Sequence, residues 1–295
     1  MATLKALRIR IGSVSSSEKI TGAMKMISSA KVHKNEMELK RLLPFRQQID
    51  SIMGHLLATG QEFNSPLIQK RDVKKAAVVV FGSDDGLCGA YNINIFKYLL
   101  TQIRELKNLY PGVEISIHPV GKKILNATKK LELPGVDVIA PAEGVDSKME
   151  PAKVNEFTEG LRESFTKGEY DLVQTVYMRF ISMSKQRPLT ETLFPVSPEI
   201  HKDSADKKED NKFYLFEPDP DSIFNEVLPM FVLSTMQEIT IENRASEQAA
   251  RVMAMQSAND NAKKLLEELQ LEYNKLRQQA ITTELLDILG GQTER

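Results

Sequence analysis

A glycine-rich turn is the first stretch whose residue types could support chemistry. A short apolar run at Ala76–Phe81 precedes the sequence Gly-Ser-Asp-Asp-Gly-Leu-Cys-Gly at residues 82–89, and a helical pattern begins near Asn92. Such a turn can cradle a phosphate at the start of a helix. Its three glycines do not follow the G-x-G-x-x-G spacing, however, and no Gly-Lys-Ser/Thr follows. Because Asp84 and Asp85 would repel a phosphate, the pattern favours a tight structural turn without a bound cofactor.

Cys88 in this turn is the only cysteine of the chain. A helix N-terminus favours a thiolate, so Cys88 is a candidate nucleophile. No histidine lies near it in sequence, and burial is the commoner fate of a lone cysteine. The four histidines are scattered without the spacing of metal ligands. The residues therefore favour neither a catalytic centre nor a metal site.

A polar cluster near the C-terminus offers a different kind of chemistry. Arg277, Gln278, Gln279 and Thr282 lie beside an aliphatic end made of Ile281, Leu285, Leu286, Ile288 and Leu289. One interpretation is a solvated helix flank with a frayed end. The other is a polar surface that meets a partner, with an apolar tip held in a sleeve of other subunits. The second is favoured, because nothing else in the chain would cover these aliphatic side chains.

The element that carries this cluster is a long helix predicted over residues 218–290. Asp219 is expected to cap it, Pro220 to occupy its first position, and Gly290-Gly291 to end it. Pro229 predicts a kink or a slackened turn near Asn225–Glu226. Apolar residues recur along it at the coiled-coil spacing of about 3.5. They are Ala245, Ala249, Val252, Met255, Ala258, Ala262, Leu265, Leu269, Tyr273, Leu276 and Ala280.

A second long helix is predicted over residues 1–58, and its charge complements that of the first. Residues 1–46 hold ten Lys/Arg against three Glu, whereas residues 219–295 hold seven Lys/Arg against thirteen Asp/Glu. Strand and helix patterns alternate over residues 72–217, which indicates a mainly parallel sheet covered on both faces. The predicted fold is therefore an antiparallel two-helix coiled coil formed by the two ends of the chain, with a Rossmann-like α/β domain inserted between them.

Three blocks of sequence resemble one known family. They are Ile20–Ile27 with Lys31, Gly86–Asn92, and the pair Ala245–Met255 and Tyr273–Thr282. Together they resemble the γ subunits of F-type ATP synthases, and they spread the likeness over the whole chain. The resemblance implies a central rotating stalk that couples proton (or sodium) flow to ATP synthesis. Its partners would be the α and β subunits, the ε subunit and the membrane c-ring, with the catalytic sites on the β subunits.

The resemblance also implies roles for individual residues. Arg277, Gln278 and Thr282 fall on positions that contact the β catch loop, and Met24 falls on the neighbouring position of the N-terminal helix. An acidic lever loop of the β subunits would suit the basic face around Lys19, Lys25, Lys31 and Lys34. The apolar tip in the sleeve would be made of Ile281, Leu285, Ile288 and Leu289.

Two other classes of protein remain open from the residues alone. A coiled-coil adaptor linking an α/β module to another assembly would have the same elongated shape, and an α/β enzyme would need a substrate site in the middle domain. Nucleic acid is not expected as a partner, because the basic helix lacks interleaved aromatic residues and faces an acidic one. No apolar run is long enough to span a membrane. The expected location is the cytoplasmic face of a bacterial plasma membrane, as a peripheral subunit.

Overall fold

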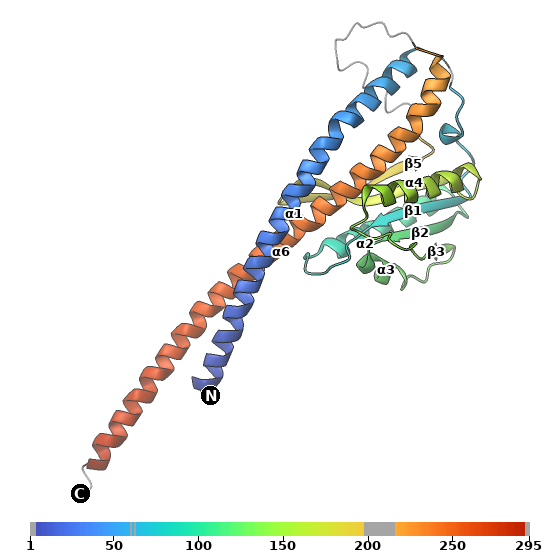
Figure 1. Ribbon diagram of the computed structural model, residues 1–295. Helices are drawn as coiled ribbons and strands as arrows, with labels where there is room; N and C mark the ends of the chain where they lie inside the picture. Colours follow the sequence, from blue (N-terminus) through green and yellow to red (C-terminus); the bar gives the residue numbers. More distant parts are fainter. Residues whose placement is uncertain (1–3, 60, 62, 198–215, 293–295) are drawn as a thin grey trace.

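The computed structural model describes residues 4–59, 61, 63–197 and 216–292. Two long helices dominate it: α1 (Leu4–Ala58) and α6 (Pro220–Gln292). They lie side by side and run in opposite directions, and α6 extends well beyond the N-terminal end of α1 (Figure 1). The predicted coiled coil of the two chain ends is therefore confirmed. The excess length of the C-terminal helix lies entirely at its free end.

The start of α6 follows its sequence signals, but its end does not. The carboxylate of Asp219 accepts hydrogen bonds from the backbone N–H of Ser222 at 2.9 Å and from its hydroxyl at 2.6 Å, which is the expected N-cap. Pro229 lies within a continuous helix. The predicted end at Gly290-Gly291 is wrong, because both glycines keep a helical backbone and α6 runs on to Gln292. Glycine permits a helix to end but does not force it to.

The inserted domain contains one five-stranded sheet of order β3-β2-β1-β4-β5. Strands β1 (Lys75–Phe81), β2 (Glu114–Val120), β3 (Val136–Val138) and β4 (Leu172–Ser182) are parallel, and β5 (Lys185–Phe194) returns antiparallel to β4. The prediction of a mainly parallel sheet is confirmed. The sequence Phe-Tyr-Leu-Phe at residues 213–216 favours a further short edge strand, but only Phe216 belongs to the described residues.

Alternate residues of β1 enter two separate cores, as the pleat of a strand requires. Ala76, Val78 and Val80 pack with α2 (Tyr91–Leu109) and α3 (Lys122–Thr128). Ala77, Val79 and Phe81 pack on the other face with α4 (Pro151–Thr166), the C-terminal part of α1 and the N-terminal part of α6. The 3₁₀ turn η1 (Pro66–Ile68) adds Leu67 to this second core. The helix pair is thus built into the domain at one end.

Beyond the domain the helix pair has only a narrow interior. Val32, Ala249 and Val252 form a small buried cluster at the edge of the domain, against which Phe180 and Met183 pack. Farther along, the described part of the pair buries only three apolar residues, Leu7, Met255 and Leu269. Asn259 Nδ2 donates to the Glu18 carbonyl at 2.7 Å, which fixes the register of the two helices there. Among the described residues, no helix combines the length and the apolar character that a membrane crossing needs.

Candidate partner-binding surfaces

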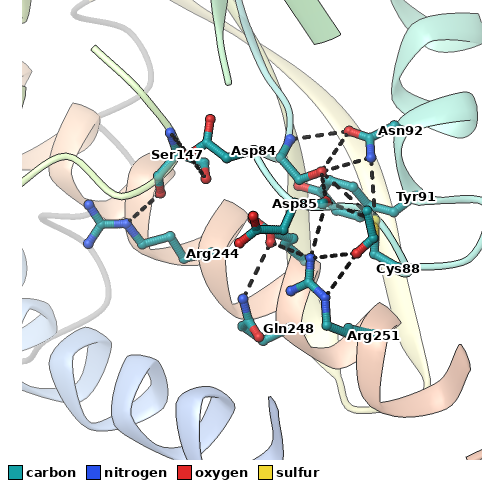
Figure 2. Close-up of polar contacts among 12 residues, drawn as sticks. Asp84, Asp85, Cys88, Tyr91, Asn92, Ser147, Arg244, Gln248 and Arg251 are labelled. Carbon is teal, nitrogen blue, oxygen red and sulfur yellow. Dashed lines mark hydrogen bonds and ion pairs between the residues drawn. The ribbon is translucent and has the colours of Figure 1, made fainter. Parts of the chain in front are cut away.

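The glycine-rich turn is filled by contacts within the chain. Asp84 Oδ1 accepts from the Lys122 N–H at 3.0 Å at the start of α3, and its Oδ2 accepts from the N–H and the hydroxyl of Ser147 (Figure 2). Asp85 pairs with Lys148 Nζ at 3.0 Å, and this hydrogen bond lowers the pKa of Asp85. The two carboxylates keep the turn negative where a phosphate would have to bind. The geometry therefore favours the structural turn over a nucleotide site.

Cys88 is buried, with 3% of its surface exposed. Asn92 Nδ2 donates to its Sγ at 3.3 Å, and the Ser83 hydroxyl lies at 3.9 Å. Burial raises the pKa of the thiol, so it stays protonated at neutral pH and is a poor nucleophile. The thiol acts as a packing group beneath the turn.

The middle of α6 contains a buried ion pair, and the arginine of this pair also bonds to the glycine-rich turn. Arg251 Nη2 lies 2.8 Å from Glu247 Oε1, and the two side chains are 7% and 4% exposed. The same guanidinium donates to the carbonyls of Asp85 and Gly86 at 3.2–3.3 Å (Figure 2). A guanidinium has several donors in a fixed plane, so one side chain can hold a carboxylate and two carbonyls together. Burial raises the pKa of Glu247, and Arg251 opposes that shift.

Two further polar residues of α6 dock on the sheet. Asn243 Oδ1 accepts from the Tyr91 hydroxyl at 2.6 Å and from the Met178 N–H at 3.4 Å, and its Nδ2 donates to the Gly82 carbonyl at 3.2 Å. Ser246 Oγ donates to the Met178 carbonyl at 2.7 Å. We call Asn243, Ser246, Glu247 and Arg251 the α6 joint. It joins the helix pair to the inserted domain through specific hydrogen bonds in addition to apolar packing.

The C-terminal part of α6 presents the opposite picture. Arg277, Gln278 and Thr282 are exposed, and within the described part of the chain their only polar side-chain contact is the Thr282 hydroxyl, which donates to the Gln278 carbonyl at 2.9 Å. Ile281, Leu285 and Ile288 are exposed beside them, while the side chain of Leu289 lies outside the described part of the chain. We call Arg277, Gln278, Thr282 and these aliphatic residues the distal surface. It has the polar and apolar halves that the sequence predicts.

The basic residues of α1 lie elsewhere. Lys31 is exposed, whereas Met24 and Lys25 are half-buried. Lys31 and Lys34 line a hollow of about 220 Å³ together with Lys148 of the inserted domain. We call Met24, Lys25, Lys31 and Lys34 the basic surface.

The structure does not bring all predicted contact residues into one site. Thr21, three residues before Met24 in α1, contacts Asn259 of α6. Arg277 lies eighteen residues beyond Asn259 along α6. At 1.5 Å per residue this separation is about 27 Å. The distal surface and the basic surface are therefore two separate regions. The resemblance to the family puts Met24 in one group with Arg277. The register of the two antiparallel helices instead places these residues far apart.

Sequence reasoning did not assign the α6 joint. Its four residues recur at steps of three, one and four, which is one stripe of a helix. A polar stripe on a helix whose other faces pack against apolar residues was the available signal. The seam residues Ala245 and Ala249 interleave with this stripe, so the sequence pattern by itself indicates only the coiled coil.

Small residues of α1 have two different environments. The hydroxyls of Ser13, Ser16 and Ser17 donate to the backbone carbonyls four residues earlier and lie on an exposed face. Ser28, in contrast, is buried with 3% exposure. The exposed serines share this stretch of α1 with the exposed side chains of Ile9 and Ile20, whereas Ser28 allows α1 to pack closely.

Comparisons with known proteins agree over nearly the full length. Residues 3–293 match the family model described as ATP synthase. The ATP synthase gamma chain of Phocaeicola vulgatus is 39% identical over 296 residues, covering 99% of both chains, and that of Bacteroides thetaiotaomicron is 37% identical over 299 residues, again covering 99% of both. A chain of the Euglena gracilis mitochondrial ATP synthase has the same fold, with a TM-score of 0.61, 22% identity and coverage of 98% and 93%.

The fold and the two surfaces define a class of protein: a stalk subunit, with a domain at one end of a long helix pair and exposed contact surfaces along the rest. The chain belongs to the family of ATP synthase gamma chains, the central-stalk subunits of F-type ATP synthases. It is a rotor subunit of that complex.

Proposed function

We propose that this chain turns inside a ring of α and β subunits of a bacterial F-type ATP synthase, at the cytoplasmic face of the plasma membrane. It would couple proton (or sodium) flow through the membrane sector to ATP synthesis, and catalysis would take place on the β subunits. The inserted domain would lie toward the ε subunit and the c-ring. The observation that carries this proposal is the contrast between the α6 joint, which is satisfied within the chain, and the distal surface, which is not.

A rotor needs a rigid connection between the part that is driven and the part that does work. The α6 joint and the core shared by α1, α4, α6 and the sheet supply that connection at the domain end. Buried, fully partnered polar groups favour a single geometry over sliding. A torque applied to the inserted domain would therefore pass into both helices.

We assign the distal surface to the β catch loops and the basic surface to an acidic lever loop of the β subunits. Arg277 is an exposed guanidinium, and guanidinium groups bind carboxylates with two parallel hydrogen bonds. Lys31 and Lys34 are exposed cations next to Lys148, a charge distribution that suits an acidic partner. The aliphatic residues at the tip would be covered by the surrounding sleeve. We propose 1–58, 72–217 and 218–290 as the units of this arrangement, with helix α6 continuing past the last boundary to Gln292.

Replacing Arg277 tests the distal assignment. Arg277→Ala in the assembled complex should lower coupled ATP synthesis in membrane vesicles while the isolated chain keeps its circular dichroism spectrum and urea midpoint. The matched control is Lys264→Ala, which removes another exposed cation from the same helix. Synthesis at the unaltered rate in Arg277→Ala would remove the distal surface from the coupling mechanism. Failure of the unaltered chain to co-purify with α, β and ε subunits would favour the adaptor instead.

A further inference from the structure

A group of charged side chains lies where α6 meets strands β4 and β5, apart from the α6 joint and both partner-binding surfaces. We call it the charged junction. Helix α1 contributes Arg46 and Asp50, strands β4 and β5 contribute Arg179 and Glu191, and α6 contributes Glu238 and Glu242. Four carboxylates thus face two guanidinium groups. The charged junction has an excess of negative charge whenever all its members are ionised.

Glu242 is the most deeply buried member and has the weakest support for its charge. Glu242 is 5% exposed. Among the described residues, the one ion-pair partner of the Glu242 carboxylate is Arg179, whose Nε lies 3.8 Å from Oε1, and the carboxylate accepts no hydrogen bond. The Arg179 side chain is 55% exposed, so water competes for its charge. The contrast with Glu247 is direct, because Glu247 is equally buried but lies 2.8 Å from a buried guanidinium.

The remaining cations and donors of the charged junction are engaged with other carboxylates. Arg46 pairs with Glu238 and lies 4.0 Å from Asp50, and the Tyr177 hydroxyl donates to Glu191 Oε1 at 2.9 Å. Burial, together with repulsion by Glu238 and Glu191, raises the pKa of Glu242 from 4.5 to about 7, although Arg179 and Arg46 oppose the shift. A buried carboxylate without a hydrogen-bond donor is expected to take up a proton.

We propose that Glu242, a buried carboxyl group without a hydrogen-bond donor, is a proton-binding group, and that loss of its proton loosens the contact between α6 and strand β4. The next residue, Asn243, accepts from the Met178 N–H, and Ser246 donates to the Met178 carbonyl. An ionised Glu242 brings a negative charge and water to this same contact. The charged junction is thus a pH-sensitive connection between the helix pair and the inserted domain, and this inference does not depend on the proposed rotor function.

The sign of the pH effect follows from proton linkage. The folded chain holds the Glu242 proton up to about pH 7, whereas the unfolded chain releases it near pH 4.5. The folded state therefore binds more protons in this range, and stability falls as the pH rises from about 4.5 to about 7. Above that range the loss is complete, and the contact is at its weakest.

A direct titration of the unaltered chain is the first test. Infrared difference spectra of the full chain, recorded from pH 5.5 to 8 with isotopically labelled glutamate, should show one carboxyl group that loses its proton near pH 7. The Glu242→Gln variant should lack this signal. If every glutamate is already ionised at pH 5.5, or if the signal persists in Glu242→Gln, the proposal is wrong.

Stability measurements test the consequence of the titration. Between pH 5.5 and pH 8 the folding equilibrium constant of the unaltered chain should fall at least roughly tenfold more than that of Glu242→Gln, since one unit of pKa corresponds to tenfold. The matched control is Glu268→Gln on the exposed face of α6, which should keep the pH dependence of the unaltered chain. Equal pH dependence in the unaltered chain and Glu242→Gln would overturn the proposal.

A second variant decides the assignment if Glu242→Gln does not fold. Arg179→Gln removes the cation that pairs with Glu242 and leaves Arg46 in place, and the half-exposed Arg179 side chain can be replaced without opening the core. The carboxyl signal should then move to higher pH. A signal that stays at the same pH would belong to another carboxylate, and Glu242 would lose its role.

Discussion

The middle and the end of α6 present opposite surfaces, although they belong to one continuous helix. Around Asn243–Arg251 nearly every side chain is buried or half-buried, and the polar ones bond to the turn and the sheet. From Leu271 onward most side chains are exposed, including Leu285 and Ile288. The first segment is completed by its own chain, and the second is shaped for partners. Substitutions along α6 should therefore change from effects on stability to effects on coupling.

The largest effect on stability is expected at the ion pair of the α6 joint. Arg251→Ala removes the guanidinium that pairs with the buried Glu247, and breaking a buried pair in this way costs about 3–5 kcal/mol. Urea denaturation of the isolated chain, followed by circular dichroism, measures this loss. Lys264→Ala is the control and should leave the midpoint unchanged. A loss similar to that control would mean that the α6 joint does not hold the helix to the domain.

A smaller loss of stability is expected from replacing Asn243, an uncharged residue of the α6 joint. Asn243→Ala removes the acceptor of the Met178 N–H and leaves the buried Tyr91 hydroxyl only the backbone carbonyl of residue 243, at 3.3 Å. A buried donor without a partner costs about 1–3 kcal/mol. The same denaturation experiment applies, with the exposed Asn261→Ala as its control. An unchanged midpoint would show that water replaces Asn243 at this position.

Between the α6 joint and the distal surface, the expected loss of stability is smaller again. Asn259 Nδ2 donates to the Glu18 carbonyl at 2.7 Å in a partly wet contact between the helices. Asn259→Ala should therefore cost about 0.5–1.5 kcal/mol, the net value of one ordinary hydrogen bond. A loss as large as that of Arg251→Ala would contradict the gradual change along α6 and would make the register of the helix pair a main source of stability.

The smallest effect on stability is expected at the tip. Leu285→Ser combined with Ile288→Ser should change the free energy of unfolding of the isolated chain by less than about 0.5 kcal/mol, because these side chains are already in water. In the assembled complex the same pair should weaken co-purification or coupled ATP synthesis. A large destabilisation of the isolated chain would show that the tip folds against another part of it.

Much of the architecture could be predicted from local patterns. The caps at Asp219 and Pro220, the apolar run at Ala76–Phe81 and the coiled-coil spacing each have a local physical cause, and the corresponding elements are present. The end of α6 could not be predicted, since a glycine only permits a break. The lengths of β4 and β5 also depend on pairing in a hairpin, which residue types alone do not reveal.

The residue types of the partner-binding surfaces could be predicted from the sequence, but not which of these residues lie together. Arg277 and Thr282 are exposed as expected for contact residues, yet Met24 lies far from them because antiparallel register sets which residues of the two helices meet. Glu242 and Glu247 show a further limit. They are one residue type on one helix, and they differ in the distance to a guanidinium. That guanidinium comes from a distant part of the chain for Glu242, at 3.8 Å, and from the next turn of the helix for Glu247, at 2.8 Å.

The placement of the two long helices at opposite ends of the chain has a consequence for biosynthesis. The apolar seam of α1 leaves the ribosome first, but its partner residues in α6 follow only after about 200 further residues. At about 5–20 residues per second this interval lasts on the order of 10–40 s. Throughout it α1 has an uncovered apolar stripe, so the nascent chain presents a binding surface for chaperones until translation is nearly complete.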